Sequence, residues 1–197
     1  MCERELNKIK QEVENCSLCP LHKSRTMVVF GDGNPKAKIF LIGEGPGFEE
    51  DKSGKAFIGR SGQLLDKILL ACNFNRNDHV YIGNIVKCRP PGNRTPSTEE
   101  QAACLPYLER QIELISPEII VILGATALQA LLGKNLKITK ERGNWHIGFN
   151  RFVMPTYHPS ALLRNPSLKK DAWEDFKKVI LKYRELVDPD HQSPFVK

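Results

Sequence analysis

Four apolar runs recur along the chain, and two of them, at 37–43 and 118–124, end in glycine. The run at 37–43 is almost continuously apolar up to its last glycine, which is typical of a strand that is buried on both faces and enters a turn. Similar runs lie at 80–86, 118–124 and 151–155. The pattern therefore predicts four buried strands.

Between these runs, apolar residues recur at helical spacing. Leu6, Ile9 and Val13 follow this spacing and predict a short amphipathic helix within residues 3–15. The other predicted helices span residues 63–72, 98–115, 125–132 and 169–186. Because strands alternate with helices, we expect an α/β fold in which helices cover both faces of a parallel sheet.

Length and charge narrow the class of protein. The length of 197 residues suits a single domain, which we place at residues 1–187, with a flexible C-terminal tail at 188–197. No apolar stretch approaches the roughly 18 residues that span a bilayer, and no N-terminal run resembles a signal peptide. Cysteine usage fits a reducing cytoplasm, and the net charge of +6 favours a polyanionic partner.

Four of the six cysteines form two groups, Cys16 with Cys19 and Cys88 with Cys104. A Cys-x-x-Cys pair presents two thiolates to one metal centre, and a second pair completes the shell when the chain folds back. Four thiolates suit a zinc ion or an iron–sulfur cluster, and spacing alone does not distinguish the two. The structural alternative is a set of buried thiols without a ligand.

Polar residues follow the predicted strands at the ends that parallel strands share. Glu44 follows the first strand, the second strand leads through Asn84 to Lys87, and His158 follows the fourth. Open parallel sheets bind ligands outside the carboxyl ends of their strands. We therefore expect an acid, an amide, an amine and an imidazole to converge in one site.

Two short segments near the first strand indicate contact with a ligand. The glycines of Gly43-Glu-Gly-Pro-Gly47 permit a tight turn and a close approach of another molecule to the backbone. Phe57 lies among small residues and offers its ring to a flat ligand, while Ser61 precedes a helix whose free amides suit phosphate. A plain turn, a core phenylalanine and an ordinary helix cap are the alternatives.

Asn84 interrupts an apolar run, where an amide is costly unless its polar atoms are paired. It either makes a buried structural hydrogen bond or reads a base, because a side-chain amide offers a donor beside an acceptor. That pair matches the O4 and N3–H edge of uracil and mismatches cytosine.

Basic residues in two segments suit DNA. Lys87 and Arg94 belong to a proline-containing basic segment that would contact phosphates. Leu163 lies in an apolar tip beside Arg164, a combination that suits a wedge entering a base stack. A solvated loop and ordinary helix packing are the alternatives.

In their order along the chain, these motifs resemble the class-four uracil-DNA glycosylases, the iron–sulfur members of the uracil-DNA glycosylase superfamily. The resemblance covers residues 1–186 and rests on Gly43-Glu-Gly-Pro-Gly47, Phe57-Ile-Gly59, Asn84-Ile-Val-Lys-Cys-Arg-Pro-Pro91, Leu123-Gly-Ala125, His158-Pro-Ser160 and the four cysteines. It implies a three-layer α/β/α sandwich with a central four-stranded parallel sheet, an N-terminal helix and a cluster loop. It also implies a structural [4Fe–4S] cluster on Cys16, Cys19, Cys88 and Cys104, with zinc as the alternative occupant.

The resemblance further implies a monofunctional enzyme that flips deoxyuridine out of DNA and hydrolyses its N-glycosidic bond, leaving an abasic site. The implied catalytic residues are His158, Glu44 and Asn84. The implied uracil-binding residues are Gly43, Glu44, Gly45, Phe57, Asn84 and His158, and the implied DNA-binding residues are Ser61, Lys87, Arg94, Ser160, Leu163 and Arg164. The partner is uracil-containing DNA, single- or double-stranded. We expect a cytoplasmic, nucleoid-associated monomer, with replication or repair proteins as further candidate partners.

Within this scheme, His158 would donate a hydrogen bond to uracil O2 as negative charge develops there. Many members of the superfamily carry an aspartate at the position of Gly45, so the usual base is absent and Glu44 is interpreted as a supporting acid. The basic insertion of members that capture DNA covalently is also missing, which indicates the hydrolytic type.

Two other functions account for part of the sequence. A non-enzymatic module that docks on DNA or on a repair partner explains the cysteines and the charge, but not Asn84 or His158. An enzyme for another damaged base, such as hypoxanthine or xanthine, would share the fold and differ in its pocket.

Overall fold

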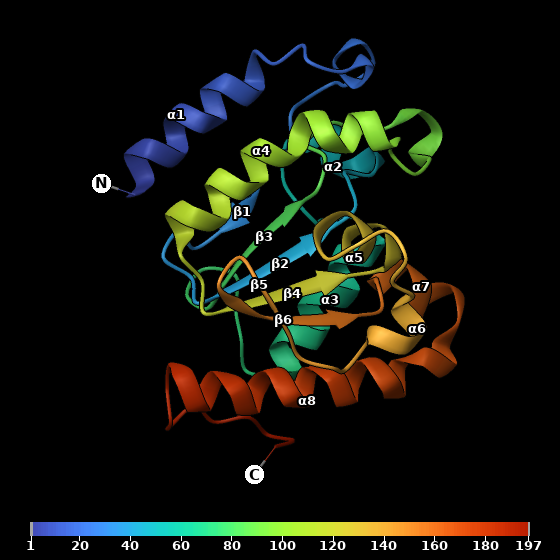
Figure 1. Ribbon diagram of the computed structural model, residues 1–197. Coiled ribbons are helices and arrows are strands. Elements are labelled where there is room, and N and C mark those ends of the chain that lie inside the picture. The colour runs from blue at the N-terminus through green and yellow to red at the C-terminus, as the bar shows by residue number, and fades with distance from the viewer. Residues whose placement is uncertain (1, 197) are drawn as a thin grey trace.

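A six-stranded sheet forms the middle layer of the protein, seen in a computed structural model that describes residues 2–196 (Figure 1). The strands are β1 (Asp32–Gly33), β2 (Ile39–Gly43), β3 (Val80–Asn84), β4 (Ile119–Leu123), β5 (His146–Gly148) and β6 (Arg151–Thr156). They lie in the order β1-β3-β2-β4-β6-β5, and the four inner strands are parallel, which confirms the predicted core. The edge strands β1 and β5 pair antiparallel and were not predicted, because two or three residues carry no periodicity.

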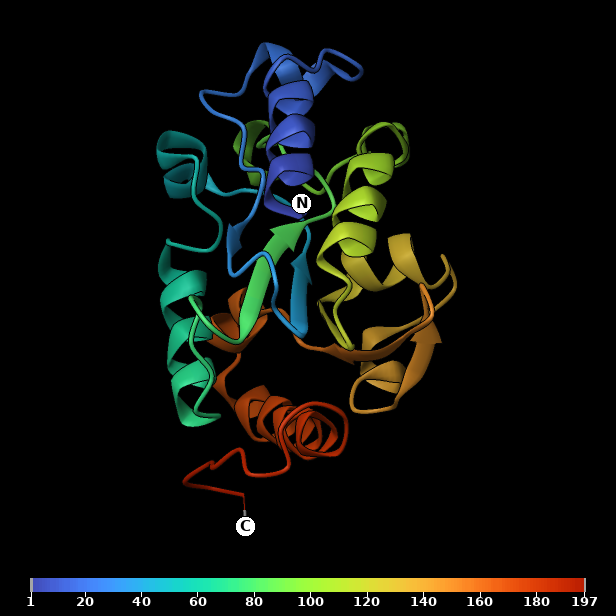
Figure 2. The ribbon, with the colours of Figure 1, turned by 90° about the vertical axis from the view of Figure 1, so that its left-hand side faces the viewer.

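Helices cover both faces of the sheet. One face packs against α1 (Cys2–Glu14), α4 (Thr98–Ile115) and α5 (Ala125–Leu131), and the other against α3 (Arg60–Ala71) and α8 (Lys169–Leu186). Figure 2 shows α1 beside α4 and, across the sheet from them, α8. Side chains alternate along each strand, so Phe40 and Ile42 of β2 join the first core while Ile39 and Leu41 join the second. The result is the predicted three-layer sandwich.

Three short helices lie near the carboxyl ends of the strands: α2 (Phe48–Ser53), α6 (Ile138–Glu141) and α7 (Pro159–Arg164). All three are too short to show apolar periodicity, and α2 and α7 begin through local capping, which is why the sequence pattern did not predict them. The Glu50 carboxylate accepts the main-chain N–H of Gly47 at the start of α2. The His158 ring accepts the main-chain N–H of Ser160 at the start of α7. No helix within residues 2–196 is both long enough and apolar enough to cross a membrane.

The C-terminal segment, which the sequence predicts to be a flexible tail, makes specific contacts with the rest of the domain. His191 is buried, stacks on Phe74 with ring centroids 4.6 Å apart, and lies with Nε2 2.9 Å from the Cys72 carbonyl oxygen. The Arg184 guanidinium donates to the main-chain oxygens of His191 and Val196. The polar composition of the segment did not reveal these partners, because they belong to other parts of the chain.

The order in which the chain adds strands to the sheet reverses between β2 and β4. The chain passes from β2 to β3 on one side and later returns to β4 on the other side of β2. The helices that follow β2 and β4, α3 and α5, accordingly cover opposite faces. Such a switch point leaves a crevice at the carboxyl ends of the strands, where ligands of this fold class bind.

Candidate active site and cysteine cavity

A cavity of about 600 Å³ opens at this crevice, at the right-hand end of the molecule in Figure 1. Its wall comes from the loop after β2, the end of β3, the start of α5 and the start of α7. The predicted site residues that line it are Glu44, Gly45, Phe57, Ser61, Asn84, Arg94, His158, Ser160 and Arg164. Topology therefore brings together most of the polar groups that the sequence placed at the strand ends.

Asn84 ends β3 and presents a buried amide to the cavity. Its side chain is 1% exposed, and its Oδ1 has no hydrogen-bond partner among residues 2–196. A buried acceptor without a partner costs about 1–3 kcal/mol, so a structural hydrogen bond does not explain this oxygen. A Cβ on Gly43 would lie 2.6 Å from it and 2.6 Å from Cζ of Phe57. Glycine at that position therefore lets the amide and the ring lie side by side.

Phe57 forms another wall of the cavity, with its ring centroid 5.5 Å from that of His158. Its φ of 53° lies in the left-handed region, which costs a residue with a Cβ about 1–2 kcal/mol. The Arg76 guanidinium donates to the Phe57 carbonyl oxygen. A Cβ on Gly62 would lie 1.8 Å from that same oxygen. The ring position is thus set by packing and hydrogen bonds around a strained backbone.

Glu50 holds the Phe57 segment against the glycine-rich turn, and the sequence analysis missed it. One carboxylate oxygen accepts the main-chain N–H groups of Ile58 and Gly59, each at 2.8 Å. The other oxygen accepts the N–H of Gly47 at 3.2 Å. The available signal was an acid three residues after Gly47, the residue that caps α2, which is the spacing of a capping box. Glu50 therefore joins two loops that line the cavity.

His158 is held as a neutral hydrogen-bond donor. Its Nδ1 accepts the main-chain N–H of Ser160 at 3.1 Å and lies 2.8 Å from the Ser160 hydroxyl. Because a main-chain N–H only donates, the proton of the neutral ring resides on Nε2. Burial and, to a smaller extent, the Arg164 cation lower the pKa of His158 to about 4, while Glu50 acts in the opposite direction. The ring is therefore neutral near pH 7.

Glu44 is anchored by Thr126, on the first turn of α5, whose hydroxyl donates to a Glu44 carboxylate oxygen at 2.5 Å. Both residues line the cavity. The sequence did not predict this contact, because Glu44 and Thr126 are far apart in the chain. They meet because β2, which precedes Glu44, pairs with β4, which precedes α5. A Cβ on Gly45 would lie 2.8 Å from Cγ2 of Val86, so a larger residue there would displace the valine.

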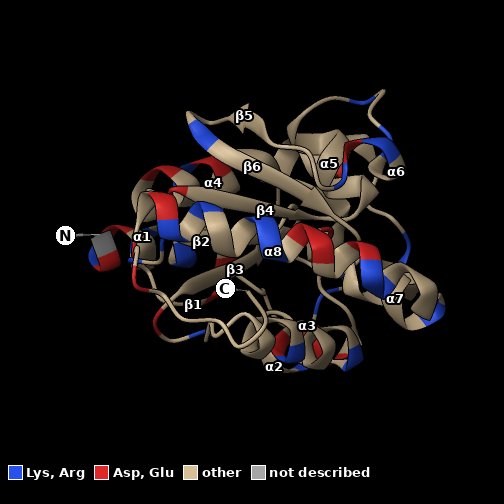
Figure 3. Cartoon of the chain, turned by 90° about the horizontal axis from the view of Figure 1, so that it is seen from below, with Lys and Arg blue, Asp and Glu red and all other residues tan. Residues whose placement is uncertain are grey.

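The predicted DNA contacts lie around the mouth of the cavity. Arg164 is exposed, and the half-exposed Arg94 forms a bidentate ion pair with the buried Glu100. Leu163, at the end of α7, is 37% exposed, and Ser61 lies in the first turn of α3. Figure 3 shows Lys and Arg on α6 and α7, at this end of the molecule. Two arginines therefore line the cavity, and the exposed Leu163 precedes one of them, Arg164, in the chain.

Lys87 is the exception among the predicted DNA contacts. Its side chain is 0% exposed, and its ammonium donates to the main-chain oxygen of Asn84 at 3.0 Å. Burial lowers its pKa to about 8. Basic residues of one irregular segment need not face the same side: Arg94 points outward, and Lys87 points into the protein. The prediction that Lys87 grips phosphate is wrong, because the side chain does not reach the surface.

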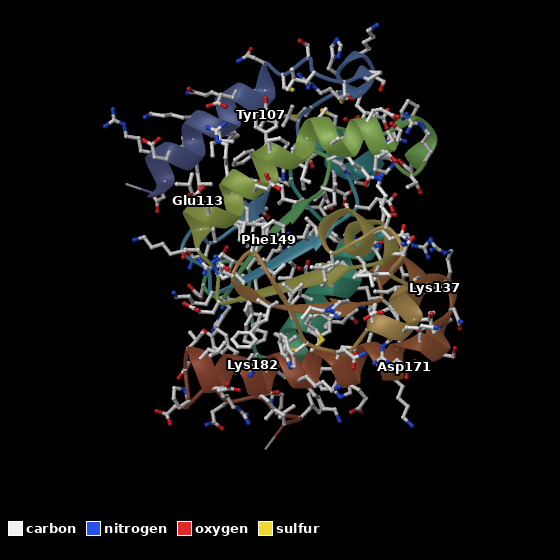
Figure 4. All side chains as sticks on the ribbon, in the orientation of Figure 1. Tyr107, Glu113, Lys137, Phe149, Asp171 and Lys182 are labelled. Atoms are coloured by element: carbon white, nitrogen blue, oxygen red, sulfur yellow. The ribbon has the colours of Figure 1, made fainter. Side chains whose placement is uncertain are left out.

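The four predicted cysteine ligands line a second, much smaller cavity between α1 and α4: Cys16, Cys19, Cys88 and Cys104. Arg25 donates to the Cys88 sulfur at 3.2 Å, and Tyr107 also lines the cavity. Figure 4 shows Tyr107 on the side of α4 that faces α1. The chain thus folds back so that the two cysteine groups meet, as their spacing predicted.

The four thiols line one cavity, an arrangement that fits the cysteine ligands of a cluster. Among the described residues, no three His, Cys, Asp or Glu side chains lie close enough together to hold a single metal ion. The cysteines of a [4Fe–4S] cluster bind different irons of one cube, and so surround a space instead of meeting at a point. Burial raises the pKa of Cys104 to about 11 and also raises that of Cys88. A positive metal centre would be needed to hold these groups as thiolates.

The fold and the two cavities define an α/β protein with a ligand crevice at its switch point and a separate cysteine site. The family model of the Uracil DNA glycosylase superfamily matches residues 30–177. A type-4 uracil-DNA glycosylase of Thermotoga maritima is 52% identical over 176 residues, covering 86% of this chain and 90% of that protein. Type-4 enzymes of Sulfurisphaera tokodaii and Archaeoglobus fulgidus are 46% and 41% identical, over 88% of this chain in both cases and 83% and 91% of the relatives.

The chain therefore belongs to the type-4 family of the uracil-DNA glycosylase superfamily. The resemblance drawn from the ordered motifs is confirmed.

Proposed function

We propose that this protein is a monofunctional uracil-DNA glycosylase, which hydrolyses the N-glycosidic bond of a deoxyuridine flipped out of DNA. The observation that carries the proposal is the buried, unpartnered Oδ1 of Asn84, in a cavity that it shares with the Phe57 ring and the His158 imidazole. Family membership supports the same reaction. A docking module would leave this arrangement of groups without a purpose.

Recognition uses the flat ring and the polar edge of the base. Phe57 stacks on the uracil ring. The Asn84 oxygen accepts N3–H, and its amide N–H donates to O4. Cytosine has an acceptor at N3 and a donor at the position of O4, so both hydrogen bonds to the Asn84 amide would be lost. A site built around buried hydrogen bonds rejects such a base strongly.

Catalysis relies on charge stabilisation at the departing base. As the C1′–N1 bond breaks, negative charge develops on uracil O2, where the Nε2–H of His158 donates a hydrogen bond. The oxygen of the attacking water bonds to C1′, and the proton that this water loses is balanced by protonation of the released uracil. Glu44, oriented by Thr126, supports the site beside this water. The attacking water needs little help from a general base once the C1′–N1 bond is nearly broken.

DNA binding uses the rim. Flipping leaves a gap in the base stack, which Leu163 fills. Arg94 and Arg164 contact phosphates, while Ser61 and Ser160 lie where the backbone of the flipped nucleotide passes. We propose that the enzyme acts as a monomer, on single- or double-stranded DNA, in the cytoplasm at the nucleoid.

The four cysteines would hold a [4Fe–4S] cluster. When bound, the cluster supplies a cross-link that joins the segment after α1 to the segment after β3 and to α4. Visible absorbance together with about four irons per chain would support it, whereas a colourless protein with stoichiometric zinc would contradict it.

Cleavage of a labelled oligonucleotide that carries one deoxyuridine, followed by alkali, tests the function. We expect scission at uracil only, with none in matched oligonucleotides that carry cytosine or thymine. Asn84→Ala should abolish scission, and His158→Ala should slow single-turnover cleavage by about 10²–10³. DNA binding without scission, in iron-loaded protein, would instead favour the docking module. An oligonucleotide that carries hypoxanthine tests the other base-excision activity.

A further inference from the structure

Lys87 combines two properties that rarely occur together. It is fully buried, yet it forms no ion pair with a carboxylate within the described residues. An ammonium taken out of water costs several kcal/mol unless an opposite charge compensates it. Because the side chain does not reach the protein surface, its charge needs a partner inside the protein.

The neighbours of Lys87 show where that partner lies. Its ammonium donates to the main-chain oxygen of Asn84 at 3.0 Å, and its side chain also lines the cysteine cavity. Its own main-chain N–H donates to the Cys104 sulfur at 3.3 Å, and its carbonyl oxygen accepts the N–H of Val29 at 2.8 Å. Lys87 therefore contacts both the end of β3, which carries the base-reading amide, and a thiol of the cysteine site.

We propose that Lys87 is a positioning residue that joins the uracil site to the cluster site. Its positive charge offsets the negative charge of the four thiolates and their cluster, and its hydrogen bond fixes the main chain of Asn84. The inference rests on the proposed function and on the proposed cluster. It adds a role for a side chain that touches neither the base nor the DNA.

Two consequences follow from this placement. Reduction adds negative charge to a cluster, so removing a buried cation beside it should lower the reduction potential. Releasing the Asn84 carbonyl should let the end of β3 move, and small displacements of a positioning group weaken recognition strongly. Both changes should occur in the same variant, although the two cavities are separate.

The test compares three variants of the iron-loaded protein. Lys87→Met keeps the length of the side chain and removes both its charge and its donor. Lys87→Gln removes the charge and keeps a donor, and it provides a milder replacement if Met at this buried position prevents folding. Lys23→Met is the matched control, because Lys23 is exposed and lies four residues after Cys19 in sequence. Iron content, cluster potential, inhibition by free uracil and affinity for DNA with an abasic-site analogue are measured for each.

For Lys87→Met we expect a lower potential and about tenfold weaker inhibition by free uracil, with unchanged affinity for abasic DNA. Lys87→Gln should show the same fall in potential and a smaller loss of uracil inhibition. Lys23→Met should resemble the wild type in every measurement, since water screens its charge. Unchanged uracil inhibition in loaded Lys87→Met would overturn the positioning role, and an unchanged potential would overturn the charge role.

These outcomes are separable from failure of the proposed function. Wild-type protein that leaves uracil in DNA would refute the glycosylase proposal, while the potentials of Lys87→Met and Lys23→Met would still decide the charge role. Active wild-type protein combined with identical behaviour of Lys87→Met and Lys23→Met would refute the inference alone.

Discussion

The two cavities differ in what the polypeptide itself supplies. In the larger cavity, hydrogen bonds within the chain hold the reactive groups: Glu50 fixes the loops, Thr126 fixes Glu44, and Ser160 sets the tautomer of His158. In the smaller cavity, the buried cysteines have raised pKa values as thiols and need a metal centre to bring them together as thiolates. The chain itself organises the larger cavity, whereas the proposed cluster would complete the cysteine site.

The largest expected effect is therefore on the cysteine side. Cys104→Ala should lose most of its iron and several kcal/mol of stability, which corresponds to a fall in Tm of about 10 °C for a domain of this size. Iron analysis and thermal unfolding measure this. Cys72→Ala is the matched control, because Cys72 is also buried but lies outside the cysteine cavity. Equal iron content in the two variants would show that Cys104 is no ligand.

An intermediate effect is expected from Glu50→Gln, which tests whether hydrogen bonds alone organise the larger cavity. The amide nitrogen cannot accept an N–H, so at least one of the three main-chain donors loses its partner. We expect kcat/KM on uracil-containing DNA to fall about tenfold, the scale of a hydrogen bond to a charged group, while iron content stays normal. Glu49→Gln, at the exposed neighbouring position, should retain wild-type kinetics. Equal kinetics in both variants would remove Glu50 from the site.

The smallest expected effect is that of His158 on the pH dependence of the single-turnover rate, which should be flat around neutral pH. Its pKa of about 4 keeps the ring neutral throughout the neutral range. The single-turnover rate should therefore not fall as pH rises through the usual histidine range near 6.5. A fall there, absent from His158→Gln, would show that a cationic ring is required.

The lowered pKa of His158 also makes the stability of the fold depend on pH. Between pH 6.5 and about 4 the unfolded chain binds a proton at His158 that the folded chain does not. Stability should thus decrease as pH falls through that window, and less so in His158→Gln. His79, whose pKa burial also lowers, acts in the same direction. Comparing the variant with the wild type at each pH therefore isolates the contribution of His158.

Local pattern was enough for the elements that bury an apolar face. The four parallel strands and the five longer helices lie where periodicity placed them, because each must bury apolar side chains at a regular spacing. The cysteine groups and the polar strand ends were also visible in the sequence, since chain topology brings the carboxyl ends of parallel strands together. The edge strands and the short helices were not predicted, because they depend on neighbours and caps.

The sequence by itself determined the fold class, the cysteine set and the residues Asn84, Phe57 and His158. Only the tertiary structure decided that Lys87 points inward, that Glu50 and Thr126 hold the site, and that His191 anchors the C-terminal segment. The physical reason is that periodicity predicts which face of a regular helix or strand is buried. The direction of a single side chain in an irregular segment depends on the hydrogen-bond partner that the rest of the fold places beside it.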